Sequence, residues 1–388
     1  MQSILITSKS SLSALGHESD EIWKNYQSKS TCLSICCFND MDTPTGRLQE
    51  KTQSLIDNLR KEHPHYRRLD KSVLMAILVG RNSLSKSKWS DLSKVGINMG
   101  SSRGATQLFE KYHEHFINSP KKRISPLVSP TTTLGNISSW MAFDFGTKGA
   151  TLTHSITCST ALHSILNASV WIKSGMTDKF IAGGTEAPLT DFTISQMRAL
   201  GIYSKNTSEW YCSPMKKRNT KNNMVLGEGA SAFCLESDEG QQHLAKIIGL
   251  GYSTEKIEHP ASLSADADCL KKSMRMALLD SELKTVDAIV MHAPGTIKGD
   301  QSEYKAIQSV FGTQTPHLIS TKHQSGHTFG ASGGLSLDLA IEMLNRKSVI
   351  QFPYETEVCQ EKCTPKTILI NAVGFGGNAV SIIVQKTD

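Results

Sequence analysis

Short apolar segments that end in glycine-rich or polar loops recur along the whole chain and alternate with helix-like stretches. Examples are "KFIAGGTEA" (179–187), "VDAIVMHAPGT" (286–296), "HLISTK" (317–322) and "KTILINAVGFGG" (366–377). This alternation predicts an α/β fold built in layers. Active-site loops lie at the ends of strands in such folds, so these loops are the first candidates for a site.

The length and composition are those of a globular protein. With 388 residues, 38% of them hydrophobic, the chain is long enough for two ordinary domains or one large duplicated unit. Its longest apolar run, "VLMAILV" (73–79), is shorter than the roughly 18 to 20 residues that cross a bilayer, and its first residues lack the pattern of a signal peptide. We therefore expect no membrane span and a cytoplasmic protein.

The cysteines and the basic clusters point to no specific ligand. Nine cysteines follow no disulfide framework, so reduced thiols are predicted. "CLSICC" and "CQEKC" have no common zinc spacing, so we expect ordinary packing there and no metal site. The net charge of +6 is spread over separate basic clusters at 66–71, 121–123 and 216–218. These clusters form no nucleic-acid motif, which leaves solvated faces or an acidic protein partner as explanations.

The segment "SITCSTALHSI" (155–165) places Cys158 where an extended stretch meets a helix. Apolar or small residues recur at three- and four-residue steps from Leu162 to Ile172, which predicts a helix of about four turns ending before Gly175. A thiol at a helix N-terminus faces unpaired N–H groups and the positive end of the dipole, and both favour the thiolate. Position alone leaves two interpretations open, a nucleophile or a buried thiol.

Three other motifs fail on their context. "GASGG" (330–334) fits a nucleophile elbow at Ser332, but that family order needs a histidine after the serine, and the last histidine is His327. "GFGGNA" (374–379) is similar to a dinucleotide fingerprint, but the strand-like "VSIIVQ" follows it where a helix is required. "GEGAS" (227–231) lacks the Lys-Ser/Thr pair of a phosphate-binding loop. We therefore predict helix packing at Ser332 and no nucleotide site.

Two histidines stand in loops at expected strand ends. His292 follows "AIVM" in the segment "MHAPGTIKGD", and His327 lies in the glycine-rich "STKHQSGHTFGASGG" before an expected helix. A single histidine is usually a structural residue, but two at strand ends are candidates for a catalytic site.

Four blocks together resemble the signature motifs of the decarboxylating β-ketoacyl-acyl carrier protein synthases, in the family's order and at similar separations. They are "SITCSTALHSI", "HAPGTIKGD", "STKHQSGHTFGASGG" and "NAVGFGGNAV". Further segments from "RRLDKSVLMA" to "VLGEGASAFCLE" also match, so the resemblance covers nearly the whole chain.

The resemblance implies an α/β fold of the thiolase-like kind, with two similar halves that each contain a mixed five-stranded sheet, packed as α-β-α-β-α layers. Residues 1–388 would form a single ketosynthase unit. Its first half, approximately 1–235, would carry the nucleophile, and its second, approximately 236–388, both histidines. No cofactor and no metal is implied.

The resemblance also assigns roles to residues. Cys158 would take an acyl group from an acyl carrier protein, with the oxyanion held by the backbone N–H groups of Cys158 and Phe375. His292 and His327 would hydrogen-bond the malonyl thioester while loss of the carboxylate creates an enolate, whose carbanion attacks the acyl-Cys158. Lys322 matches a lysine that supports His327. Phe375 matches the gate of the acyl pocket.

The expected partners are the acyl and malonyl forms of an acidic acyl carrier protein and a second subunit. Arg67, Arg68 and Lys71 match the family's basic docking surface, where charge acts mainly on association rate and salt dependence. The second subunit would be either an identical chain or a related ketosynthase-like subunit.

Several positions depart from the family pattern. Pro294 stands in "HAPGT" where the family usually has H-G-T-G-T, Thr157 replaces a common alanine, and Ala372 and Val373 stand where Ser and Phe are frequent. Ser336 occupies a position where many members carry Glu. Asp338 lies on a different face of the expected helix, which leaves the acidic partner of Lys322 open.

These departures favour a divergent type II enzyme, in a specialised fatty acid, polyketide or polyene pathway. The competing interpretation is a chain-length-factor-like, non-catalytic subunit of a heterodimer. It ranks second because such subunits have typically lost the nucleophile that is present here. A third, the carrier-priming or chalcone-type condensing enzymes, expects Cys-His-Asn rather than Cys-His-His.

Overall fold

The computed structural model describes residues 3–386 except 122, 207–209, 257–262 and 313–314, so Lys122 of the basic cluster at 121–123 lies outside the described residues. The strands are β1 (Ile4–Leu12), β2 (Ser34–Phe38), β3 (Met41–Thr45), β4 (Gly96–Gly100), β5 (Thr151–Leu152), β6 (Lys179–Glu186), β7 (Gly229–Ser237), β8 (Ala245–Thr254), β9 (Ala288–Val290), β10 (His317–Ile319), β11 (Thr367–Gly374) and β12 (Asn378–Gln385). The helices are α1 (Ser19–Gln27), α2 (Glu50–Glu62), η1 (Pro64–Arg68), α3 (Lys71–Lys86), α4 (Thr106–Asn118), α5 (Val128–Thr132), α6 (Asn136–Phe145), α7 (Thr160–Lys173), α8 (Asp191–Ala199), α9 (Asp268–Asp280), α10 (Ile297–Phe311), α11 (Lys322–Ser325), η2 (Phe329–Ala331) and α12 (Ser332–Asn345).

The main sheet repeats one strand pattern twice. In the first half the order is β1-β7-β6-β4-β5, and in the second it is β8-β12-β11-β9-β10. In both sets the first three strands run antiparallel to their neighbours and the last three run parallel. The predicted duplication and its two mixed five-stranded sheets are thus confirmed. The structure adds that the two sets join into one continuous ten-stranded sheet, because β1 pairs with β8 over Ile4–Ile6 and Ala245–Ile247.

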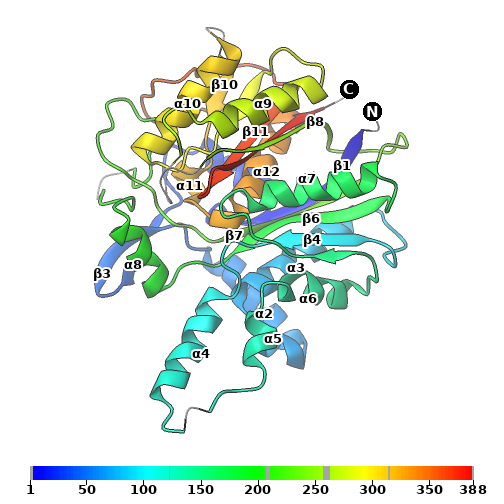
Figure 1. Ribbon diagram of the computed structural model, residues 1–388, viewed down its shortest axis with the longest axis vertical. Helices are drawn as coiled ribbons and strands as arrows, with labels where there is room; N and C mark the ends of the chain where they lie inside the picture. Colours follow the sequence, from blue (N-terminus) through cyan, green and yellow to red (C-terminus); the bar gives the residue numbers. More distant parts are fainter. Residues whose placement is uncertain (1–2, 122, 207–209, 257–262, 313–314, 387–388) are drawn as a thin grey trace.

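The helices form three layers around these strands (Figure 1). Helices α3 and α6 pack on one outer face, α9 packs on the other with α10 beside it, and α7 and α12 lie between the two sets of strands. The predicted α-β-α-β-α order is therefore present. Figure 1 also shows α4 and α5 projecting from the lower layer, away from the central helices.

The two central helices have the sequences that such a position requires. Residues Leu162 to Ile172 of α7 are buried at the three- and four-residue steps predicted from sequence, and α12 is buried from Ser332 to Leu344. A helix without a polar face is stable only when protein surrounds it. A Cβ built on Gly333 would lie 2.7 Å from Cγ of Leu162, so glycine is what lets α12 approach α7.

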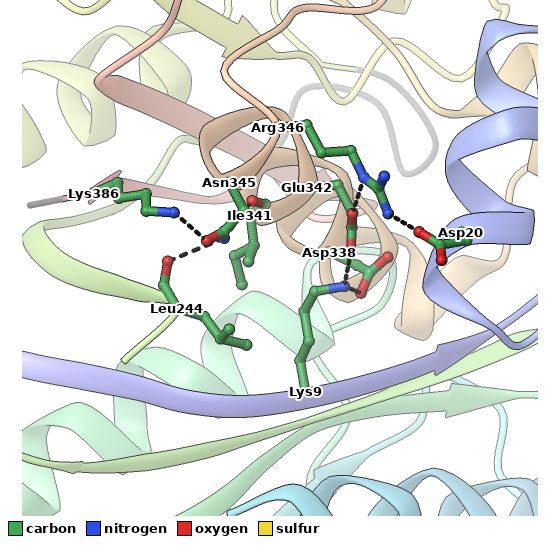
Figure 2. A network of polar contacts seen from close by, with 9 residues as sticks. All are labelled: Lys9, Asp20, Leu244, Asp338, Ile341, Glu342, Asn345, Arg346 and Lys386. Atoms are coloured by element: carbon green, nitrogen blue, oxygen red, sulfur yellow. Dashed lines mark hydrogen bonds and ion pairs between the residues drawn. The ribbon is translucent and has the colours of Figure 1, made fainter. Parts of the chain in front are cut away.

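A buried ion-pair network connects α12 to the first strand (Figure 2). Lys9 Nζ on β1 lies 2.6 Å from Asp338 Oδ1 and 2.8 Å from Glu342 Oε1, and Arg346 Nε lies 2.7 Å from the second oxygen of Glu342. Arg346 also pairs with Asp20. Lys9, Asp338 and Glu342 are the buried members of the network, and removing one of them typically costs about 3–5 kcal/mol because it leaves an uncompensated charge. The network therefore holds β1 of the first half against α12 of the second.

The motifs rejected from sequence fall as predicted. "GFGGNA" is followed by β12 rather than by a helix, "GEGAS" runs into β7, and Ser332 begins α12. Among the residues described, no helix combines the length and the apolar character needed to cross a membrane.

Candidate active site

Cys158 lies in a tight turn of residues 156–160, which we call the nucleophile turn. Ser159 N–H donates to the carbonyl of Ile156 (3.2 Å), and Thr160 Oγ1 accepts from Ile156 N–H (2.8 Å) while donating to the carbonyl of Thr157 (2.6 Å). These bonds close the chain on itself directly before α7 begins at Thr160. Cys158 is buried, and its predicted position at a helix N-terminus is confirmed.

The two histidines come from loops of the second half and face each other. His292 follows β9, and its backbone N–H donates to Glu303 Oε1 (2.9 Å). His327 follows α11, and its backbone N–H donates to the carbonyl of Val225 (2.7 Å). The ring centroids are 5.2 Å apart and the planes are perpendicular. Nδ1 of each ring is buried without a hydrogen-bond partner in the protein.

A cavity of about 510 Å³ brings these residues together. Cys158, His292, His327 and Phe375 all line it, although they come from four separate sequence blocks. The volume falls within the usual range of about 300–1,000 Å³ for ligand pockets. Much of the remaining wall is apolar, formed by Met197, Ile202, Met224, Leu263, Phe329 and Val373. The arrangement combines a thiol, two imidazoles and apolar walls, which suits an acyl chain held beside a reacting carbonyl.

The electrostatic environment of Cys158 differs from the sequence expectation. Burial raises the pKa of the thiol to about 12, and the carboxylate of Glu186 adds to the shift, while Lys322 and Arg103 act in the opposite direction. The helix N-terminus was expected to favour the thiolate, but the loss of solvent outweighs it here. The free site therefore holds a protonated thiol, which must pass its proton to a neighbouring group when it attacks.

Both imidazoles are neutral across the physiological pH range. Burial lowers the pKa of His327 to about 3, and the charge of Lys322 adds to this effect. Burial also places the pKa of His292 well below its ordinary value, with Lys322 and His327 contributing. A neutral imidazole carries one N–H donor and one free acceptor nitrogen. Each ring is therefore able either to accept the thiol proton or to donate a hydrogen bond to a developing oxyanion.

Lys322 is fully buried and does not line the cavity. Its Nζ donates to Ser336 Oγ (3.3 Å), at the position where many relatives were expected to have Glu. Asp338 is not its partner, since that carboxylate is paired with Lys9. Burial lowers the pKa of Lys322, and Glu303 is the foremost charge opposing this. Glu303 is therefore the acidic group that most favours the charged form of Lys322.

Two buried carboxylates of the site were missed from sequence. Glu303 accepts from the N–H groups of His292 and Ala293 (2.7 Å for the latter), which fixes the loop after β9. Asp300, one turn earlier on α10, accepts from Gly295 N–H (3.1 Å) in the same loop. Both follow "HAPGT" at helical spacing in "IKGDQSE". Acidic residues on the buried face of a helix directly after a catalytic loop were the available signal.

Glu186 was missed in the same way. At the end of β6 it accepts from Ser101 Oγ (2.9 Å) and from the N–H groups of Ser102 (2.8 Å), Arg103 (3.1 Å) and Gly330 (3.0 Å). These bonds join the turn after β4 to the loop that follows His327. Burial nevertheless raises the pKa of Glu186 to about 7. Its signal was a single carboxylate ending the apolar strand "KFIAGGTE".

The predicted docking residues lie in two different settings. Arg67 and Arg68 are exposed at the end of η1. Lys71 begins α3 and is largely buried, with its Nζ 2.7 Å from Oε1 of the buried Glu228. The charge of Lys71 is thus balanced within the protein, and the free positive charge of this cluster comes from the two arginines.

The raised pKa of Cys158 makes its alkylation strongly pH-dependent. Below the pKa the thiolate fraction grows tenfold per pH unit, so the iodoacetamide rate at Cys158 should rise about tenfold per unit from about pH 7 to pH 10. Peptide mass spectrometry measures this rate, with the exposed Cys37 as an internal reference for the reagent. A rate that levels off near pH 8 would show that the helix N-terminus prevails over burial.

Comparison with known proteins agrees with this geometry. Residues 1–240 match the family model described as "Beta-ketoacyl synthase, N-terminal domain", and residues 244–353 match "Beta-ketoacyl synthase, C-terminal domain". The chain belongs to the β-ketoacyl synthase family. It is thus a condensing acyltransferase of the kind that the resemblance indicated. Its nine cysteines are all free thiols, as predicted.

Relatives of this synthase share its full length at low identity. The 3-oxoacyl-[acyl-carrier-protein] synthase 2 of Staphylococcus aureus (strain COL) is 26% identical over 410 residues, covering 99% of this chain and 98% of the relative. A solved ishigamide ketosynthase/chain length factor has a TM-score of 0.87 at 18% identity, and a type II polyketide ketosynthase complex with its acyl-carrier protein and a bound hexaketide has 0.84 at 20%. Each structure covers 100% of both chains, which establishes the shared fold.

Proposed function

We propose that the synthase takes an acyl group from an acyl carrier protein onto Cys158 and extends it by decarboxylative Claisen condensation with malonyl-acyl carrier protein. The observation that carries this proposal is the shared cavity, in which one thiol and two neutral imidazoles meet beside apolar walls. The product is a β-ketoacyl-acyl carrier protein. No cofactor or metal takes part in the proposed reaction.

In the first half-reaction the sulfur of Cys158 attacks the acyl thioester, and the carrier's thiol leaves. The thiol proton passes through a neighbouring neutral imidazole to the departing sulfur of the carrier, because the thiol of Cys158 has no appreciable ionised fraction near neutral pH. The backbone N–H groups of Cys158 and Phe375 are the proposed oxyanion donors. In support, a Cβ built on Gly374 would lie 3.0 Å from the N atom of Cys158, so the two peptide segments are in contact.

In the second half-reaction malonyl-carrier protein occupies the cavity and loses carbon dioxide. His292 and His327 donate hydrogen bonds to the thioester oxygen, which becomes an enolate oxygen as the carboxylate leaves. The carbanion then attacks the acyl carbonyl, and Cys158 departs as a thiolate when the new carbon–carbon bond forms. A proton from solvent restores the thiol of the free site. Lys322 acts through its charge, which helps to keep both imidazoles neutral and thus able to donate.

The non-catalytic alternative is disfavoured by the completeness of the site. A chain-length-factor-like subunit needs no nucleophile, whereas Cys158, His292 and His327 all line one cavity here. Lys322 also keeps an acidic neighbour in Glu303 although Ser336 replaces the usual one.

We also propose how the unit is organised. Residues 1–388 form one catalytic unit whose halves meet near residue 235, because the strand pattern begins again with β8. We expect a dimer, with either an identical chain or a related ketosynthase-like subunit. The low identity to its relatives fits a specialised fatty acid, polyketide or polyene pathway. The free cysteines fit a cytoplasmic location.

The acidic carrier protein should dock on Arg67 and Arg68. Reversing both charges to Glu should raise the carrier-protein KM about tenfold at low salt and leave kcat unchanged, since exposed charges act mainly on association. The matched control is Lys272→Glu with Arg275→Glu, which makes the same charge change on the exposed face of α9 in the opposite outer layer. An unchanged KM in the first variant would exclude this docking surface.

The decisive test of the function is product formation by the purified wild-type protein. Acyl-carrier proteins of different chain lengths are incubated with the protein and malonyl-carrier protein, and the mass of the carrier-bound product is measured. A β-ketoacyl product two carbons longer than the primer supports the proposal. Absence of product with every primer, alone and with a co-expressed partner subunit, would point to the non-catalytic subunit.

A further inference from the structure

Thr157, directly before the nucleophile, has a backbone conformation that its side chain disfavours. Its φ is +48°, in the left-handed region where β-branched residues are outliers. On its C-terminal side the turn is fixed by Thr160, whose hydroxyl binds the carbonyl of Thr157. Such strain persists only where the surroundings hold the residue in place, and it is most often found at functional sites.

The side chain of Thr157 reaches across to the loop that carries Phe375. Its Oγ1 donates to the carbonyl of Phe375 (3.3 Å), 218 positions away in the sequence. Oγ1 also lies against Gly374, on the side where any other residue would carry its Cβ. The hydroxyl of Thr157 thus contacts both Gly374 and the carbonyl of Phe375.

The loop that Thr157 contacts is the tip of the hairpin formed by β11 and β12. Residues 374–377, which we call the gate turn, have positive φ at Gly376 (+93°) and Gly377 (+68°), and Gly377 N–H donates to the carbonyl of Gly374 (3.1 Å). At the far end Glu255 N–H donates to the carbonyl of Gly377 (3.2 Å). Phe375 lines the cavity and is 38% exposed. Its position therefore depends on anchors at the two ends of the turn.

We propose that Thr157 is a positioning residue that couples the nucleophile turn to the gate turn. Its hydroxyl anchors Phe375 at the end of the gate turn nearest Cys158, so that the ring covers the cavity and the backbone N–H stays directed toward the reacting carbonyl. The orientation of the backbone N–H matters only if the proposed function holds, so that part of the inference rests on it. The covering of the cavity by the Phe375 ring is a property of the free protein and is measurable without any substrate.

Loss of this hydroxyl has two separate consequences. The gate turn gains freedom, so Phe375 covers Cys158 less and a small reagent reaches the thiol more easily. The oxyanion donor at Phe375 becomes less ordered, so acylation slows at the chemical step. Carrier docking is unaffected, because the docking surface lies elsewhere. The expected signature is faster alkylation together with a lower acylation kcat at constant KM.

The experiment compares two near-isosteric variants of Thr157. Thr157→Val keeps the β-branched shape and removes the hydroxyl, whereas Thr157→Ser keeps the hydroxyl and removes the methyl group. In the valine variant we expect iodoacetamide alkylation of Cys158 at pH 8 to accelerate about fivefold and the acylation kcat to fall about fivefold, the effect of one hydrogen bond. The serine variant should stay within about twofold of wild type in both.

The two readouts separate this inference from the proposed function. If wild type forms no acyl-enzyme, the proposed function fails while the alkylation rates still decide the role of Thr157. Equal alkylation rates in wild type, valine and serine variants would overturn the coupling. So would a serine variant that matches valine, since the hydroxyl would then be irrelevant. Thr157→Ala replaces the valine variant if circular dichroism shows the latter to be unfolded.

Discussion

Replacing Cys158 with alanine should abolish condensation, with a loss on the order of 10⁴-fold or more, while malonyl-carrier protein is still decarboxylated. The sulfur of Cys158 is the only protein atom that bonds to the acyl group in the proposed reaction, so no acyl-enzyme forms without it. Decarboxylation relies on His292 and His327, which the substitution leaves in place. Product mass on the carrier measures the first effect, and release of carbon dioxide the second.

Two controls make the Cys158→Ala result specific. Cys37→Ala removes an exposed thiol outside this cavity and should leave both reactions unchanged. Cys158→Ser keeps a small polar group but supplies a far weaker nucleophile, so it should behave like the alanine variant. Retention of more than about one per cent of condensation in either Cys158 variant would contradict the assignment of the nucleophile.

Replacing His327 with alanine should lower the decarboxylation rate by about 10²–10³-fold, the usual cost of removing one oxyanion donor. His292→Ala should have a similar effect, and the double variant should lose less than the product of the two, because both rings act on one oxygen. His327→Asn should recover part of the rate, since its amide still donates a hydrogen bond. His113→Ala, on the exposed face of α4, is the matched control.

The pH dependence of decarboxylation provides a second check on the histidines. The folded-state pKa of His327 is about 3, below its ordinary value, so the ring is neutral at neutral pH and is protonated only as the pH falls toward about 3. Decarboxylation should therefore show no loss from protonation of His327 between about pH 7.5 and 5. A fall in rate centred near pH 6.5 that is absent in His327→Ala would contradict this assignment.

Much of the secondary structure could be predicted from local patterns, because buried helices and strands have apolar residues at regular spacings. The steps from Leu162 to Ile172 predicted α7, and the segment after "GFGGNA" was correctly interpreted as a strand, now β12. The join between β1 and β8 was not predictable, since backbone pairing between strands leaves no mark on side-chain order. The partner of Lys9 was equally hidden, because it lies 329 positions away.

For the site, residue identity was easier to predict than environment. Cys158, His292 and His327 were candidates from their positions at a helix N-terminus and at strand ends, and the family resemblance assigned their roles. The structure places all three on one cavity. The protonation state of Cys158 was not predictable, because it depends on how deeply the whole fold buries the thiol. Glu186 was missed because backbone N–H groups of a distant segment satisfy its carboxylate. Glu303 was missed although its N–H donors lie in the preceding loop, where its spacing was a usable signal.

The repeated strand pattern divides the reacting groups between the two halves of the chain. One copy of the repeat supplies the sulfur and the other supplies both rings, so neither copy by itself contains a reaction centre. A half-chain produced by proteolysis or by a premature stop near the junction would be chemically inert. The edge of β1 that pairs with β8 would be exposed, and its unpaired backbone N–H and C=O groups could bind strands of other molecules. Activity and solubility therefore depend on the same event, the closure of one copy on the other.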